Sequence, residues 1–173
     1  LPWQKPLAIG LSVLLFAEAA YLLVTKSRPV GNVLPPAEAV NATENLQQLG
    51  KSVSIINTKN PLLLELAEQV AALKLQTGAS AREIAAANQL VMLTQRLAKN
   101  ANSLLVADAI DPEVAFLLGK DTNTFRDVLG ALAKGSEAMR INPATDAETK
   151  EKLVELDASF KEYQEAVAGI LGN

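Results

Sequence analysis

The chain has 173 residues, of which 49% are hydrophobic and only 4% are aromatic, and it contains neither cysteine nor histidine. The missing residue types exclude disulfides, Cys nucleophiles, His general bases, Ser–His triads, and zinc or haem sites built on those ligands. The net charge is −3 for the whole chain. From Val30 onward it falls to −5, with 13 basic and 18 acidic residues, a balance that argues against nucleic-acid binding.

The first predicted element is an apolar helix from Pro6 to Thr25, in which Glu18 is the only charged residue. Its 20 residues, at about 1.5 Å each, cover roughly the 30 Å thickness of a bilayer core. Trp3 and Tyr21 lie near its two ends, as in an aromatic belt. We therefore predict a transmembrane helix.

The anchor is expected to occupy residues 1–29, followed by an extracytoplasmic helical-bundle sensor domain in residues 30–173. A signal peptide cleaved near Ala17-Glu18-Ala19 is one alternative, and an ordinary buried core helix is another. Lys26 and Arg28 by themselves favour a cytoplasmic downstream side. The sequence opens with Leu1 rather than Met, and basic residues upstream of Leu1 would favour the opposite orientation.

Capping signals divide the remaining chain into helices. Asn60-Pro61 and Asp111-Pro112 each combine an N-cap residue with a Pro at the first helical position. Ser80-x-x-Glu83 and Thr145-x-x-Glu148 have the spacing of a capping box. The predicted helices cover residues 37–57, 61–76, 80–107, 112–134 and 145–171.

The last helix shows the amphipathic pattern that a bundle requires. Apolar residues recur at three- and four-residue spacing, while its other face is charged. Short joints between such helices predict an all-α fold, with an N-terminal transmembrane helix followed by an antiparallel helical bundle. The stripe consists of Leu153, Leu156, Phe160, Tyr163, Val167 and Ile170.

The most distinctive stretch is the helix around residues 88–101. At about 100° per residue, an apolar seam from Leu90 to Leu104 lies on one narrow face, with polar residues along a flank. Such a flank either binds a ligand, with Arg96 as a forked donor to an anion, or is a solvated surface with Arg96 paired to a nearby acid. The spacing alone favours the second reading. The candidate ligand-binding residues are Gln89, Gln95, Arg96 and Asn100.

Met92-Leu-Thr-Gln-Arg-Leu-Ala-Lys99 resembles the RMLSQRMAK signature of the PilJ family, the input domains of type IV pilus chemoreceptors and their nitrate-sensor relatives. Residues 118–135 and the closing helix are similar to the helices that follow the signature. The resemblance covers about Ser80 to Leu171, with weaker support in the anchor. Val91 stands where the family pattern has an Arg. Because that Arg belongs to the nitrate-binding edge in nitrate sensors, nitrate sensing does not carry over.

The resemblance implies a periplasmic sensor anchored in the bacterial inner membrane, acting in chemotaxis and twitching motility. It also implies a homodimer. We expect the ligand to be a pilin subunit or a small molecule, and we expect neither an enzymatic activity nor a cofactor. Members of the family carry two copies of this module. Here about Ser80 to Leu171 form one clear copy, and residues 37–76 are a candidate for a partial second copy. With no second span or signalling coiled coil, the chain is expected to be a fragment of a receptor, or a receptor-like protein without an output domain. The alternative is a membrane-tethered structural or assembly protein of the cell envelope.

Overall fold

The computed structural model describes residues 36–107 and 110–172. Within them the chain forms four helices and no strand: α2 (Pro36–Gln76), α3 (Ala81–Val106), α4 (Pro112–Lys134) and α5 (Ala147–Leu171). The predicted anchor, 1–29, lies outside the described residues. None of the described helices combines the length and apolar character needed to span a membrane.

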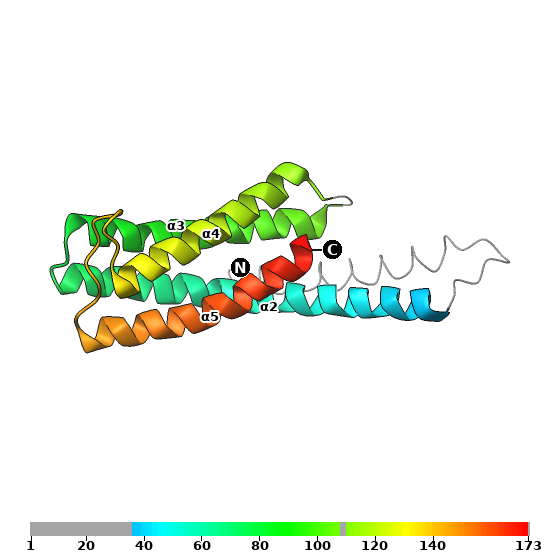
Figure 1. Cartoon of the computed structure of the whole chain (residues 1–173), viewed down its shortest axis with the longest axis horizontal. Coiled ribbons are helices and arrows are strands. Elements are labelled where there is room, and N and C mark those ends of the chain that lie inside the picture. Colours follow the sequence, from blue (N-terminus) through cyan, green and yellow to red (C-terminus); the bar gives the residue numbers. More distant parts are fainter. Residues whose placement is uncertain (1–35, 108–109, 173) are drawn as a thin grey trace, which may run out of the picture.

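The four helices form an antiparallel bundle in which each helix packs against the helices next to it in a ring, and α5 closes the ring against α2 (Figure 1). The order around the ring is α2, α3, α4, α5. Lys59 of α2 pairs with Glu162 of α5 at 3.1 Å, whereas Ser52 lies beside Gly169. Because the residue numbers run in opposite directions across this contact, α2 and α5 are antiparallel. The all-α bundle is therefore confirmed.

Helix α2 is one uninterrupted helix of 41 residues with Pro61 inside it. The predicted break, with Asn60 as the N-cap of a separate helix, is wrong. Residues on both sides of Pro61, such as Ile56 and Leu63, are fully buried in the same core. Burial on both sides outweighs the roughly 3 kcal/mol that an interior proline costs a helix, and the ring of Pro61 itself is exposed.

The other helix starts follow the predicted signals, with one shift. Ser80 and Glu83 form a complete capping box, and the Asp111 carboxylate accepts a hydrogen bond from the backbone N–H of Glu113 at 2.9 Å. At α5, however, the N-cap is Asp146 rather than Thr145. Its carboxylate accepts from the backbone N–H and the hydroxyl of Thr149, at 3.0 and 2.6 Å. A carboxylate that takes two donors satisfies the helix start better than the predicted box.

The core is aliphatic at most levels and aromatic where α4 meets α5. Phe125 stacks on Phe160 with ring centroids 4.5 Å apart, and Phe160 stacks on Tyr163 at 6.4 Å. All three rings are fully buried. This aromatic contact holds α4 and α5 together and fixes which levels of the two helices face each other.

The first four turns of α2 extend toward and beyond the end of the bundle, and of their apolar side chains only Leu49 packs against the core of the described residues (Figure 1). We call residues 36–51 the α2 overhang; its side chains are mostly exposed. The apolar seam that α2 buries in the bundle continues into the overhang at alternating three- and four-residue spacing. The seam positions are Ala39, Ala42, Leu46, Leu49, Val53, Ile56, Asn60, Leu63, Ala67 and Val70.

Candidate functional site

Helix α3 places the distinctive stretch as its periodicity predicts. The whole seam, Leu90, Leu93, Leu97, Ala101 and Leu104, is buried in the core. Val91, which replaces the Arg of the family pattern, packs partly buried against that core. An Arg at this position would have to place its charge along the same apolar surface. The Val at this position, which is the departure from the nitrate-sensor pattern, thus fits the packing of α3.

The candidate polar residues do not form one connected group. Gln89 and Gln95 are exposed and Asn100 is half-buried. Gln95 directly precedes Arg96 in the sequence, so the two side chains point about 100° apart around the helix. Gln89 and Asn100 share the flank of Arg96, but no hydrogen bond links either side chain to Arg96 in the described part of the chain.

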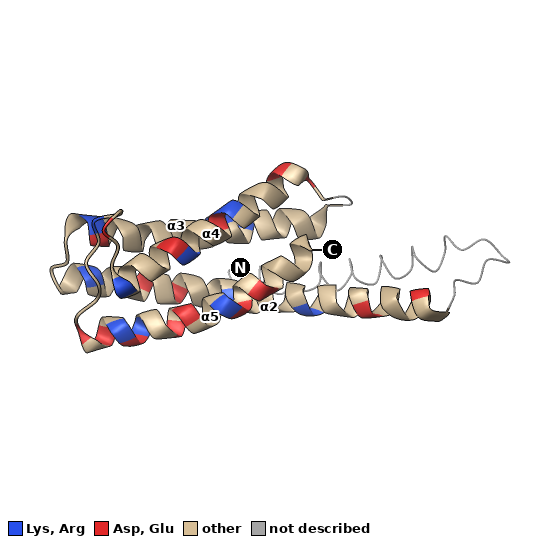
Figure 2. Ribbon diagram, in the orientation of Figure 1, with Lys and Arg blue, Asp and Glu red and all other residues tan. Residues whose placement is uncertain are grey.

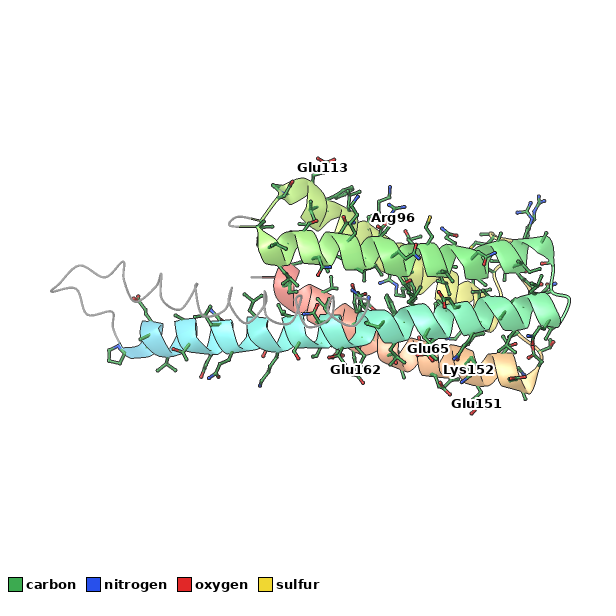
Figure 3. All side chains as sticks on the ribbon, turned by 180° about the vertical axis from the view of Figure 1, so that it is seen from behind. Glu65, Arg96, Glu113, Glu151, Lys152 and Glu162 are labelled. Atoms are coloured by element: carbon green, nitrogen blue, oxygen red, sulfur yellow. The ribbon has the colours of Figure 1, made fainter. Side chains whose placement is uncertain are left out.

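Arg96 is instead paired across to α4. Its Nη2 lies 3.0 Å from Oδ1 of Asp121, and the Arg96 side chain is 46% exposed whereas that of Asp121 is 3% exposed. Figure 3 labels Arg96 on α3, at the side where α4 passes. An anionic ligand at Arg96 would therefore have to compete with a carboxylate already in place. The solvated-flank reading was right that Arg96 meets a nearby acid, but that acid is buried.

Asp121 is the residue that reasoning from the sequence missed. It lies on the buried face of α4, between Leu118 and Phe125 at three- and four-residue spacing, together with the buried Thr122. The available signal was a carboxylate within an apolar stripe, because acids are rarely buried without a partner. The second oxygen of Asp121, Oδ2, is buried and has no hydrogen-bond partner among the described residues.

A second buried ion pair closes the hairpin between α2 and α3. Lys74 Nζ lies 3.3 Å from Glu83 Oε1, with the two side chains only 4% and 9% exposed. Oε2 of Glu83 accepts a hydrogen bond from the backbone N–H of Ser80 at 2.9 Å. Burial raises the pKa of Glu83, but the hydrogen bonds from Ser80 and Lys74 together with the charge of Lys74 outweigh it and lower the pKa. All of these contacts are within the hairpin, so the group is structural.

Charges elsewhere are dispersed. Basic and acidic residues are interspersed along α2, α4 and α5, whereas Glu83 is the one acid on the described helix α3 (Figure 2). Surface pairs such as Lys161 with Asp157, 3.1 Å apart, are local to one helix. Among the described residues, the ion pairs that join different helices are therefore Arg96–Asp121, Lys74–Glu83 and Lys59–Glu162.

Comparison with known proteins gives a matching family model and a similar protein. Residues 72–173 match the family model PilJ, described as "Type IV pili methyl-accepting chemotaxis transducer N-term". The chain is similar to the Protein PilJ of Pseudomonas aeruginosa, with 31% identity over 104 residues. That match covers 60% of this chain but 15% of the relative. The matched region contains α3, α4 and α5, together with the last turn of α2.

Proposed function

Since the chain belongs to the PilJ family of type IV pili methyl-accepting chemotaxis transducer N-terminal domains, we propose that it is the extracytoplasmic sensor part of a type IV pilus chemoreceptor. In this proposal residues 1–29 anchor the chain in the bacterial inner membrane, and the bundle senses in the periplasm. The output is directed to chemotaxis and twitching motility. No enzymatic step is part of the proposal.

The observation that carries the proposal is the continuity of α2. Its 41 residues span about 60 Å at 1.5 Å per residue. One end lies in the bundle against α3 and α5, and the other end, which begins at Pro36, lies beyond the bundle. A helix without a break at Pro61 moves as a unit, so a small shift within the bundle is carried to the overhang.

The flank of α3 that carries Gln89, Arg96 and Asn100 is the proposed ligand-binding edge, and a pilin subunit or a small anion is the proposed ligand. Binding there would draw the guanidinium of Arg96 away from Asp121, which lies 3.0 Å from it. Because that pair joins α3 to α4, its opening alters the packing of these two helices. Ligand binding would thus shift the balance between two arrangements of the bundle.

The test compares two substitutions with opposite expected signs in the intact receptor. Asp121→Asn frees the guanidinium and should increase the response to an anionic ligand, or lower the concentration needed for it. Arg96→Ala should abolish the response, although it also leaves the Asp121 carboxylate without its partner and lowers stability. Arg126→Ala is the matched control, because Arg126 pairs only with its exposed neighbour Asp127 at 3.5 Å.

The readouts are twitching or pilus-dependent signalling in cells, and thermal unfolding of the same variants by circular dichroism. If signalling falls in Asp121→Asn and Arg96→Ala in proportion to their lost stability, the ion pair is only structural and the binding edge is wrong. Topology reporters that place Asn173 in the cytoplasm would contradict the periplasmic location.

A further inference from the structure

One level of the core holds three buried polar atoms from three different helices. They are Asn60 Oδ1 on α2, Asp121 Oδ2 on α4 and the Tyr163 hydroxyl on α5, and none of them has a hydrogen-bond partner among the described residues. Tyr163 is fully buried and Asp121 nearly so. Native cores rarely leave such groups unpaired, and an ordered small molecule is the usual partner when they do.

The packing places the three residues at the same height in the bundle. Asp121 precedes Phe125 by about one turn, and Tyr163 follows Phe160 by about one turn. Because Phe125 stacks on Phe160 and the two helices are antiparallel, Asp121 and Tyr163 lie at one level.

Asn60 joins the same level from α2. Its neighbour Lys59 pairs with Glu162, the neighbour of Tyr163, at 3.1 Å. Burial raises the pKa of the Tyr163 hydroxyl, and the adjacent Asn60 amide offsets part of that rise. The contact between Asn60 and Tyr163 nevertheless falls short of hydrogen-bond geometry, since both polar atoms remain unpartnered.

The chemistry of the three atoms defines what could satisfy them. Asn60 Oδ1 and Asp121 Oδ2 can only accept a hydrogen bond, whereas the Tyr163 hydroxyl can donate one and also accept. A carboxylate or phosphate would add acceptors where donors are lacking. The ring of Phe160, which stacks on that of Tyr163, is fully buried at this level, which favours an occupant with a single heavy atom.

We propose that Asn60, Asp121 and Tyr163 form an internal site for one small hydrogen-bond donor, either water or ammonium. The bound molecule connects α2 with α4, which lie diagonally in the bundle and do not pack directly on each other. It thereby couples the long helix to the carboxylate that holds Arg96. The site stands on burial and unpaired atoms alone, so it does not rest on the proposed function.

The first experiment is a double-mutant cycle with Asn60→Leu and Asp121→Leu, each of which removes an acceptor oxygen, in the intact chain in detergent, followed by urea unfolding. Because either change releases a shared molecule, the combined loss of stability should be smaller than the sum of the two single losses. Asn60→Leu combined with Ser80→Ala, at the far end of the bundle, is the control pair and should be additive. Additive effects for Asn60 and Asp121 would overturn the proposal.

A second experiment identifies the occupant in the unaltered chain, so it does not depend on any variant folding. Thermal unfolding is measured in ammonium chloride and in equal potassium chloride, because potassium is similar in size but donates no hydrogen bond. A higher midpoint temperature in ammonium alone identifies ammonium. Midpoints that are the same in the two salts, together with an ordered water between the three side chains in a crystal structure of the unaltered chain, identify water. Equal midpoints with no ordered molecule between the three side chains contradict the site.

Discussion

Glu83 is the residue whose ionisation ties the fold most directly to pH. It joins α2 to α3 through Lys74 at 3.3 Å and completes the capping box with Ser80. Its pKa is lowered in the folded chain. The pKa of Asp146, which accepts two hydrogen bonds from Thr149 at the start of α5, is lowered as well. Both carboxylates therefore favour the folded state only while they are ionised.

The sign of the resulting pH dependence follows from these lowered values. A group with a folded pKa below its unfolded one contributes its full stability above the unfolded value, about 4.3 for Glu, and loses it as the pH falls through the folded value. We therefore expect the free energy of unfolding to decline below about pH 4.3. In Glu83→Gln this decline should be shallower, because one of the two responsible carboxylates is gone.

At neutral pH, Glu83→Gln leaves the buried ammonium of Lys74 without its counter-charge and should cost about 3 kcal/mol. Urea unfolding at a series of pH values measures both effects. Glu155→Gln is the control, because Glu155 pairs with Lys152 on the surface at 3.6 Å and should lose less than about 1 kcal/mol. Equal losses in the two variants would show that Lys74–Glu83 behaves as a surface pair.

At the scale of the element, α2 is held in one piece by its neighbours rather than by its own sequence. Pro61 lacks the backbone N–H that would bond to the carbonyl of Asn57, and its local signal is that of a helix start. The helix continues because its seam is buried against α3 and α5 on both sides of the proline. The intrinsic preference of a residue is thus overridden where tertiary burial is large.

Pro61→Ala is the test of this account. The Ala restores the missing backbone donor at an exposed position and should stabilise the chain by about 1 to 3 kcal/mol. Glu65→Ala, one turn further on and also exposed, should change stability by less than about 0.5 kcal/mol. Thermal and urea unfolding report both. A loss of stability in Pro61→Ala would mean that α2 needs the local geometry of proline to fit the bundle.

At the scale of the whole molecule, the overhang is the part of the structure with the least packing. Its Leu46 and Leu49 continue a seam that is buried further along α2, yet Leu46 remains only half-buried. A three- and four-residue apolar repeat of this kind is typical of helices that pair in a coiled coil. We propose that two copies of the chain pair through the overhang.

Leu46→Glu should dissociate this dimer without unfolding the bundle. Each copy would lose about 1.5 kcal/mol of apolar burial, which weakens the dimer roughly 100-fold for two copies. Gln47→Glu makes a similar charge change off the seam and is the control. Analytical ultracentrifugation in detergent gives the mass, and circular dichroism checks the fold. If both variants retain the mass of the unaltered chain, the overhang is not the dimer seam.

Several features of this protein follow from local rules that act within a few residues, so the sequence by itself determined them. The starts of α3 and α4, the buried seam from Leu90 to Leu104, and the family of the matched region are of this kind, because capping and helical periodicity need no knowledge of distant contacts. Other features join residues far apart in the chain, and only the tertiary structure decided them. These are the continuity of α2 through Pro61, the pairing of Arg96 with Asp121, and the meeting of Asn60, Asp121 and Tyr163 at one level. The physical reason is that burial against a neighbouring helix depends on how whole helices align, which no local spacing specifies.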